Sequence, residues 1–284
     1  MSLKSKIKDT FKSTTKSSIK RGKTVMGLVD TVAGGYRAAT KIDAWREPPR
    51  DILPKYIQAF CRKSARALGV EVIEVEPVPK THALWASNHI SWMDVPVVGS
   101  VSPAFFLSKA EVAKMPVMGP LAKVAGTLFI KRGSGDAGSV ASQMATFLEM
   151  GYSVMFFPEA TTTDGRQIKK LHGKLLQAAM DANKPIQPIV ICYINKEGEL
   201  DDTVPYYGGI RLKDSLMSVI DGDLVTAYVL PLQPLYPEDK TRDELTAELQ
   251  ERMQAGLEEL HSRVVKSQQN KLKWQSQHNC NKNR

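Results

Sequence analysis

Short apolar runs alternate with stretches of helical periodicity from residue 82 onward. The runs have the length and composition of buried strands: His82–Ser87, Ala104–Leu107, Thr127–Lys131, Tyr152–Phe157, Ile186–Tyr193 and Leu224–Leu230. Helical periodicity marks Val140–Met150, Leu171–Asn183 and Arg242–Val265. Strands separated by helices predict an α/β fold, with a mostly parallel sheet flanked by helices. Ligands of such sheets bind where loops leave the carboxyl ends of the strands, so the residues after each strand are the candidates for chemistry.

The start of the chain has a different pattern, in which lysines surround widely spaced apolar residues. Leu3, Ile7, Phe11 and Ile19 are four or eight positions apart, with lysines at positions 4, 6, 8, 12, 16 and 20. This spacing predicts a basic amphipathic helix of the kind that lies in an anionic lipid interface. A helix that packs on its own domain, or a disordered segment, is the alternative.

A second helix is predicted before the sheet begins. Glu47-Pro48-Pro49-Arg50 breaks the first helix, Ile52–Leu68 has helical periodicity, and Gly69 is its expected stop. We therefore divide the chain into an N-terminal helical region for membrane association at 1–80, an α/β domain at 81–265 and a basic tail at 266–284.

Positive charge is concentrated at the two ends of the chain. The net charge is +9, yet residues 1–23 carry eight Lys or Arg against one Asp, and residues 263–284 carry six and no acid. The region between them is therefore mildly acidic. Two basic arms suit phosphate groups, either of lipid head groups or of nucleic acid. A solvated tail is the alternative for the C-terminal arm.

Cysteine use and hydropathy bear on location. Cys61, Cys192 and Cys280 are far apart and odd in number, which fits a reducing compartment better than a disulfide framework. The most apolar candidate span, Val25–Ala39, is shorter than the roughly 18 residues that a spanning helix needs and is interrupted by charges and glycines. We also find no pattern of a secretory signal. The expectation is a protein attached peripherally to the cytoplasmic face of the inner or plasma membrane.

The first candidate site follows the first predicted strand, in Asn88-His89-Ile90-Ser91-Trp92-Met93-Asp94. On one continuous helix, His89 and Asp94 would point in different directions. If His89 lies in a loop and a helix begins near Ser91, Asp94 can reach back to an imidazole nitrogen. A carboxylate placed there fixes the tautomer that a general base needs. The alternative is a capping box, Ser91-x-x-Asp94, with an incidental histidine.

Two further candidates follow later strands. Lys131 and Arg132 end the third strand and suit a phosphate, which Arg132 can bind through its planar guanidinium group. A solvated pair of cations is the alternative.

Glu159 follows the fourth strand, where a carboxylate is costly unless it is partnered or functional. A helix-initiating or ion-paired carboxylate is the alternative there.

A competing motif lies between strand and helix, where Gly133-Ser134-Gly135-Asp136-Ala137-Gly138 matches G-x-G-x-x-G. That spacing indicates a dinucleotide site and keeps an NAD(P)-dependent oxidoreductase as an alternative. Asp136 among the amides meant for pyrophosphate argues against it. We find neither the G-x-S-x-G of α/β-hydrolases nor a histidine spacing typical of metal sites, so no metal is predicted.

Taken in order, these segments resemble the glycerolipid acyltransferase family, which includes 1-acyl-glycerol-3-phosphate acyltransferases and lyso-ornithine lipid acyltransferases. The N-H-x-S-x-x-D motif is matched at 88–94, G-x-x-F-I-x-R at 126–132 and F-P-E-G-T at 157–161, and Pro188 stands for the fourth motif. The resemblance covers His82–Tyr193. It departs at Ala160, in place of glycine, and at Thr162, where members that form phosphatidic acid usually carry arginine. Ala160 is tolerable if the backbone there avoids positive φ.

The resemblance implies an O-acyltransferase of membrane phospholipid biosynthesis, without a cofactor, that takes an acyl group from acyl-CoA or acyl carrier protein. It implies that His89, oriented by Asp94, removes the proton of a lysophospholipid hydroxyl, most simply that of 1-acyl-glycerol-3-phosphate; lyso-ornithine lipid is the alternative acceptor. Backbone amides near the helix start are expected to hold the oxyanion. The implied substrate-binding residues are Arg132, Glu159, Lys131, Gly126 and Thr161.

Partners follow from the same resemblance. They are the lysophospholipid, the acyl thioester on CoA or on acyl carrier protein, and an anionic membrane surface, with no nucleic acid. An apolar slot for the donor chain is expected among Phe105, Phe106, Met115, Val117 and Met118, although such a cluster is also typical of plain core.

Overall fold

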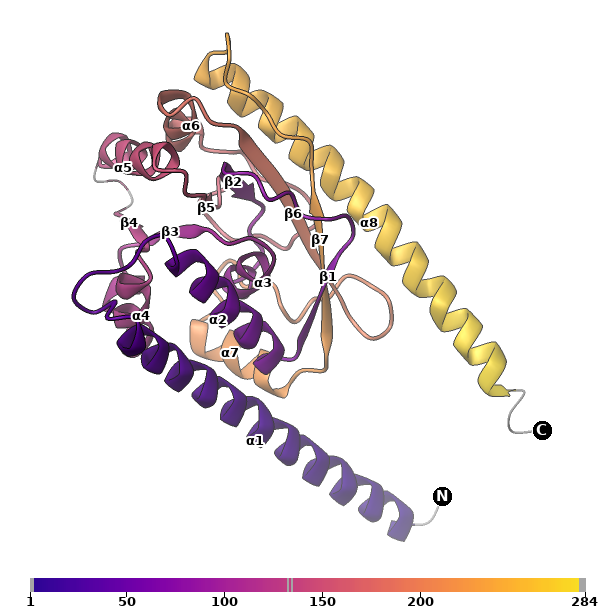
Figure 1. Cartoon of the computed structure of the whole chain (residues 1–284). Helices are drawn as coiled ribbons and strands as arrows, with labels where there is room; N and C mark the ends of the chain where they lie inside the picture. Colours follow the sequence, from indigo (N-terminus) through magenta and orange to yellow (C-terminus); the bar gives the residue numbers. More distant parts are fainter. Residues whose placement is uncertain (1–2, 132, 134, 281–284) are drawn as a thin grey trace.

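The computed structural model describes the backbone of residues 3–131, 133 and 135–280. Within those ranges, side chains are described for residue 18 and for residues 20–265. A seven-stranded sheet in the order β1-β7-β6-β2-β5-β3-β4 forms the centre (Figure 1). The strands are β1 (Val70–Glu74), β2 (Leu84–Ser87), β3 (Phe105–Lys109), β4 (Leu128–Ile130), β5 (Val154–Phe156), β6 (Ile186–Ile194) and β7 (Val225–Pro231).

Every strand pair in the sheet is parallel except β6 with β7. The carboxyl ends of β2, β5 and β6 therefore lie at one edge of the sheet, and the loops that follow them share that edge. The predicted α/β class with a mostly parallel sheet is confirmed, and all six predicted strands are present.

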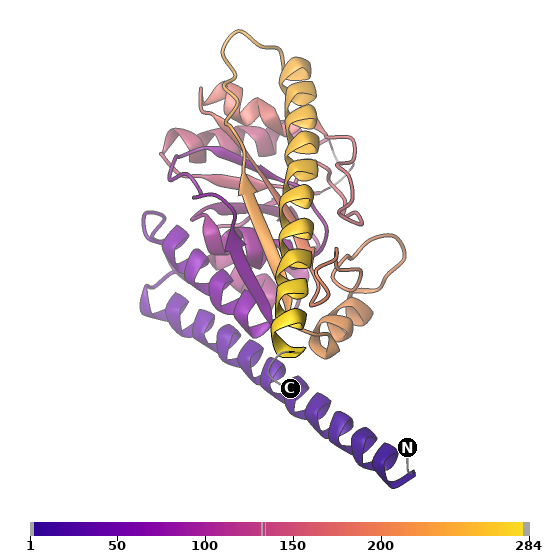
Figure 2. The ribbon, with the colours of Figure 1, turned by 90° about the vertical axis from the view of Figure 1, so that its right-hand side faces the viewer.

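Helices cover both faces of the sheet, so its middle strands are buried on both sides. They are α1 (Leu3–Lys41), α2 (Leu53–Ala67), α3 (Asp94–Val101), α4 (Met118–Val124), α5 (Ala137–Glu149), α6 (Gln177–Asp181), α7 (Leu212–Asp221) and α8 (Arg242–Cys280), with short 3₁₀ turns η1 (Val112–Lys114) and η2 (Gly173–Leu176). One hydrophobic cluster joins the sheet to α5, α6 and α8, and a second joins it to α2 and α3. Figure 2 shows α8, in yellow, in front of the sheet, and the hydrophobic cluster beneath it also contains residues of α5 and α6.

Strand β6 shows why the middle strands of the sheet have continuous apolar sequences. All nine of its residues are buried. Val190 and Cys192 belong to the cluster under α8, whereas Ile191 and Tyr193 belong to the cluster under α3. A strand that is covered on both faces needs apolar side chains at both phases of the pleat.

Three predicted boundaries are wrong. Strand β1 was not predicted, because Glu71 and Glu74 give this segment a polar pattern. β1 pairs with β7, so the sheet begins at Val70, outside the range 81–265 that was predicted for the α/β domain. The helix predicted over Leu171–Asn183 is shorter and consists of η2 and α6. The backbone of α8 continues as helix through Cys280, so most of the segment predicted as a tail extends this helix.

The long helix α1 is docked on the domain by its basic residues. Arg21 donates from Nε to Asp221 Oδ1 at 2.6 Å, and Lys20 donates to the carbonyl oxygen of Gly222. Thr31 and Ala39, further along, are buried. Packing on its own domain, the alternative to lipid contact, therefore holds for this part of α1. The side chains of Leu3, Ile7, Phe11 and Ile19 lie outside the described residues.

Within the described part of the chain, no helix combines the length and the apolar character needed to cross a membrane.

Packing of α8 supplies a test of the core. Leu249 is fully buried in the stripe that α8 presents to the sheet. We expect Leu249→Ala to lower the free energy of unfolding by about 2–5 kcal/mol, because it removes buried methyl groups and leaves a cavity. Leu224→Ala is the control, since Leu224 is 70% exposed and its loss should change stability by less than about 0.5 kcal/mol. Urea denaturation of both variants would contradict this packing if the two losses were equal.

Candidate active site

Asn88 fixes the point at which the chain leaves β2. Its side chain donates from Nδ2 to the carbonyl oxygen of Ile191 at 3.0 Å, and its Oδ1 accepts from the backbone amide of Ile191 at 2.8 Å. These two hydrogen bonds extend the pairing of β2 with β6 by one residue, with the Asn88 side chain in place of backbone groups. Because Asn88 is buried, the residue that follows it has a defined starting position at the carboxyl edge of the sheet.

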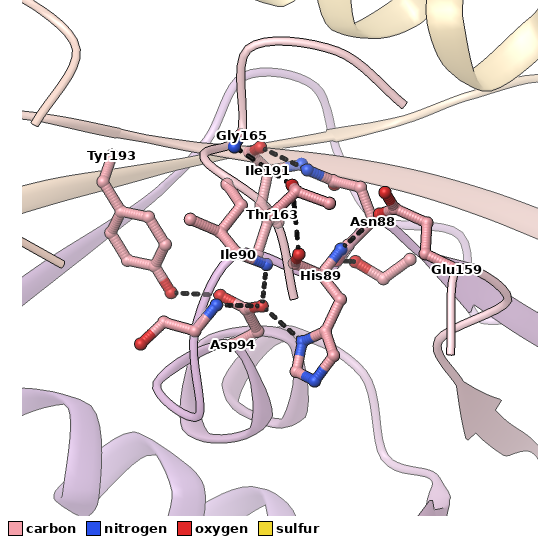
Figure 3. Close-up of polar contacts among 11 residues, drawn as sticks. Asn88, His89, Ile90, Asp94, Glu159, Thr163, Gly165, Ile191 and Tyr193 are labelled. Atoms are coloured by element: carbon pink, nitrogen blue, oxygen red, sulfur yellow. Dashed lines mark hydrogen bonds and ion pairs between the residues drawn. The ribbon is translucent and has the colours of Figure 1, made fainter. Parts of the chain in front are cut away.

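His89 and Asp94 are in direct contact (Figure 3). Nδ1 of His89 lies 2.7 Å from Oδ2 of Asp94. His89 is in the loop after β2 and Asp94 is the first residue of α3, so the predicted contact is confirmed. The capping interpretation is also partly correct, because Oδ2 accepts from the amide of Ser91 at 2.9 Å. Ser91 Oγ itself has no hydrogen-bond partner within the described part of the chain.

The Asp94 carboxylate is completely buried and collects four hydrogen bonds. Besides His89 and the Ser91 amide, Oδ2 accepts from the amide of Ile90 at 2.6 Å, and Oδ1 accepts from the hydroxyl of Tyr193 at 2.8 Å. The amides of Ile90 and Ser91 are thus already used. The expectation that amides at this helix start hold an oxyanion is wrong for these two.

The contact with Asp94 determines which nitrogen of His89 is available. A carboxylate accepts hydrogen bonds, so the imidazole proton belongs on Nδ1 and Nε2 is left with its lone pair. The imidazole stacks on Phe157 with ring centroids 4.1 Å apart, and 17% of the His89 side chain is exposed. The ring is therefore held in place and oriented, yet it still reaches solvent.

Glu159 and Thr163 hold the main chain of His89 from both sides. Oε1 of Glu159 accepts from the amide of His89 at 2.8 Å, and Oε2 accepts from the amide of Lys169 at 2.9 Å. On the other side, the amide of Thr163 donates to the carbonyl oxygen of His89 at 2.9 Å. Burial raises the pKa of Glu159, opposed by the two amide hydrogen bonds and by His89.

The placement of Glu159 differs from the predicted contact with a head group. The residue is 2% exposed and both of its oxygens face backbone amides. These contacts make it a support for His89. Thr163 and Tyr193 were not predicted as site residues. The sequence does hold a signal for Tyr193, because the hydroxyl of a tyrosine inside a buried strand needs a hydrogen-bond partner.

The structure places three of the other predicted substrate-binding residues relative to the strands of the sheet. Lys131 follows β4, which β5 and β3 separate from β2 along the sheet. Gly126 precedes β4 with φ of 69°, and Thr161 is exposed in the loop after β5. Arg132 lies outside the described residues. The predicted substrate-binding role of these four residues stays a prediction.

Two details of the sequence interpretation are corrected. Ala160 has φ of 53°, so the backbone does enter the left-handed region, at a cost of roughly 1–2 kcal/mol for a residue with a Cβ. The proposed donor slot is not one cluster: Phe105 and Phe106 are buried on opposite faces of the sheet, whereas Val117 and Met118 are exposed.

Known proteins share this arrangement of sequence and fold. Residues 69–192 match the model of the family described as Acyltransferase. The chain is 34% identical over 215 residues to a lyso-ornithine lipid O-acyltransferase of Pseudomonas aeruginosa, covering 75% of this chain and 83% of the relative. It is 30% identical over 167 residues to a 1-acyl-sn-glycerol-3-phosphate acyltransferase of Neisseria gonorrhoeae, covering 58% of this chain and 65% of the relative.

A solved structure agrees at the level of the fold. The 1-acyl-sn-glycerophosphate (LPA) acyltransferase PlsC of Thermotoga maritima superposes with a TM-score of 0.62 at 17% identity, over 87% of this chain and 97% of that one. The glycine-rich segment 133–138 falls inside the span matched by the acyltransferase model, which leaves the oxidoreductase alternative without support. The chain therefore belongs to the acyltransferase family.

Proposed function

We propose that this acyltransferase moves a fatty acyl group from a thioester to the free hydroxyl of a lysolipid, with His89 as general base. The observation that carries the proposal is the buried Asp94 carboxylate on Nδ1 of His89, which leaves Nε2 as the proton acceptor. The role of a base oriented by a carboxylate follows from this geometry.

The reaction proceeds without a covalent enzyme intermediate. Nε2 of His89 takes the proton of the acceptor hydroxyl while the hydroxyl oxygen attacks the thioester carbonyl carbon. The resulting imidazolium is stabilised by Asp94. The tetrahedral intermediate then expels the thiolate, the C–S bond breaks, and the imidazolium returns its proton to sulfur. The products are an ester and a thiol, and His89 ends in its starting protonation state.

For the acceptor we favour lyso-ornithine lipid over 1-acyl-glycerol-3-phosphate. The Pseudomonas relative named for that substrate is more similar than the Neisseria relative and matches more of both chains. Thr162 also stands where the resemblance leads us to expect an arginine in members that form phosphatidic acid. An ornithine head group carries no phosphate, so it has less need of that arginine. The Neisseria similarity keeps 1-acyl-glycerol-3-phosphate as the second candidate.

The donor and the membrane belong to the same proposal. Acyl-CoA or acyl carrier protein supplies the thioester, and Lys131, Arg132, Gly126 and Thr161 remain our candidates for contacts with the acceptor. Lys20 and Arg21 are occupied by the domain itself, so attachment to anionic lipid rests on the lysines at positions 4, 6, 8, 12 and 16. This attachment is peripheral and on the cytoplasmic face.

Thiol release tests the reaction and the acceptor together. Purified protein is given a long-chain acyl-CoA or acyl carrier protein with lyso-ornithine lipid or 1-acyl-glycerol-3-phosphate. We expect lyso-ornithine lipid to stimulate release most, and His89→Ala to lower kcat by about 10²–10⁴-fold because the general base is lost. His82→Ala, at the exposed start of the segment that leads into β2, should leave the rate unchanged.

Each outcome has a distinct meaning. No release with any acceptor and either donor would overturn the proposal. Faster release with 1-acyl-glycerol-3-phosphate would replace the favoured acceptor with the second candidate.

Glu159→Gln tests the support of His89. An amide side chain has one acceptor oxygen, so one of the two backbone amides would face an NH₂ group instead of a carboxylate oxygen. We expect kcat to fall by about 10–100-fold with KM little changed, since an unsatisfied buried donor costs about 1–3 kcal/mol. Glu149→Gln, at the exposed end of α5, is the matched control. A rise in KM at unchanged kcat would instead indicate that Glu159 contacts the substrate.

Salt dependence tests the attachment to membranes. In flotation assays with vesicles that contain anionic lipid, we expect binding at low ionic strength and release in about 1 M salt, because screening weakens a lysine contribution of about 1 kcal/mol per residue. Exchange of the lysines at 4, 6, 8 and 12 for glutamine should have the same effect as salt. Retention of the unaltered protein at high salt would rule out an electrostatic attachment.

A further inference from the structure

The two oxygens of Asp94 have different surroundings. Oδ2 accepts from the imidazole of His89 and from the amides of Ile90 and Ser91. Among the described residues, Oδ1 accepts its hydrogen bond from Tyr193 alone, at 2.8 Å. A buried carboxylate oxygen without a donor is costly, so the position and the charge distribution of Asp94 depend on this hydroxyl.

Tyr193 is placed by the strand that also places Asn88. It is 2% exposed in β6, where it pairs with Ala227 of β7. Asn88 is bonded to the backbone of Ile191, two residues earlier on the same strand. The donor to Asp94 and the anchor of the catalytic loop therefore share one rigid element, which fixes their separation.

The chemistry of the phenol makes it a donor throughout the physiological pH range. Burial and the Asp94 carboxylate raise the pKa of Tyr193 well above its ordinary value, so the hydroxyl keeps its proton. The thiol of Cys192 beside it is neutral as well, because burial raises its pKa to about 12. Two carboxylates bond to His89 itself, Asp94 at Nδ1 and Glu159 at the backbone amide.

We propose that Tyr193 is a positioning residue of the acyl transfer, which holds Asp94 against His89 and sets how strongly His89 binds its proton. The inference rests on the proposed role of His89. A donor on Oδ1 draws negative charge away from Oδ2, the oxygen that faces the imidazole. Without it, Oδ2 becomes a stronger acceptor, and the imidazolium form of His89 gains stability.

Tyr193→Phe tests the inference, with Tyr152→Phe as the matched control. Tyr152 is half-buried on the other face of the sheet, edge-on to Phe105 and Phe147. For Tyr193→Phe we expect the acid limb of the kcat/KM profile to move to higher pH by about half a unit to one unit, the equivalent of one hydrogen bond. We also expect kcat to fall by about tenfold at unchanged KM. Tyr152→Phe should move neither.

A second measurement separates this inference from the proposed function. In full-length protein with isotope-labelled histidine, the titration midpoint of the His89 ring should shift upward in Tyr193→Phe, whether or not any acceptor turns over. An unchanged midpoint in a folded variant would overturn the inference even if acyl transfer is active. If wild-type protein shows no transfer but the midpoint shifts, the proposed function fails, and what stands is that Tyr193 controls through Asp94 how strongly His89 binds its proton.

A fluorinated tyrosine tests the same inference if the Tyr193→Phe variant does not fold. 3-Fluorotyrosine at position 193 keeps the hydroxyl and makes it a stronger hydrogen-bond donor. The acid limb and the His89 midpoint should then both move to lower pH. A shift in the other direction, or none, would contradict a donor that controls the charge on Asp94.

Discussion

The buried carboxylate of Asp94 determines the structure around it. An ionised group with no exposed surface is tolerated only when its lone pairs are satisfied, and Asp94 obtains donors from three sources. The loop supplies the amides of Ile90 and Ser91, β6 supplies Tyr193, and His89 supplies Nδ1. The turn after β2 and the start of α3 follow from this requirement, because the two amides can reach one oxygen only if the chain curls around it.

The remaining supports hold His89 before any substrate arrives. Its amide is bonded to Glu159 and its carbonyl oxygen to Thr163, both from the loop after β5. The residue before it is bonded to β6 through Asn88. Strands β2 and β5 thus deliver the residues that follow them to one histidine at the carboxyl edge of the sheet, and β6 contributes Ile191 from within the strand. Held in this way, the proposed base needs little reorganisation during the reaction, which is how fixed dipoles and fixed geometry lower a barrier.

What the sequence predicts well is local or strongly patterned. The six predicted strands were found because their sequences are apolar runs, which in β2, β5 and β6 reflects burial of every residue. β1 was missed because Glu71 and Glu74 interrupt it at the sheet edge. His89 and Asp94 were paired because a loop at His89 followed by a helix start near Ser91 brings two residues that are close in sequence together. Tyr193 is 99 residues from Asp94, and only the β2–β6 pairing brings the two together. The positive φ of Ala160 was missed because a residue with a Cβ normally avoids that region.

Glu159 shows how hydrogen bonds from backbone amides change the role that a carboxylate can have. A carboxylate at a strand end suggests a ligand-binding group, and nothing in the residue types reveals that two main-chain N–H groups already occupy it. Its charge still acts on its surroundings. Glu159 and Asp94 together place two carboxylates beside His89, which favours the imidazolium of the proposed proton transfer and disfavours a third anion close by.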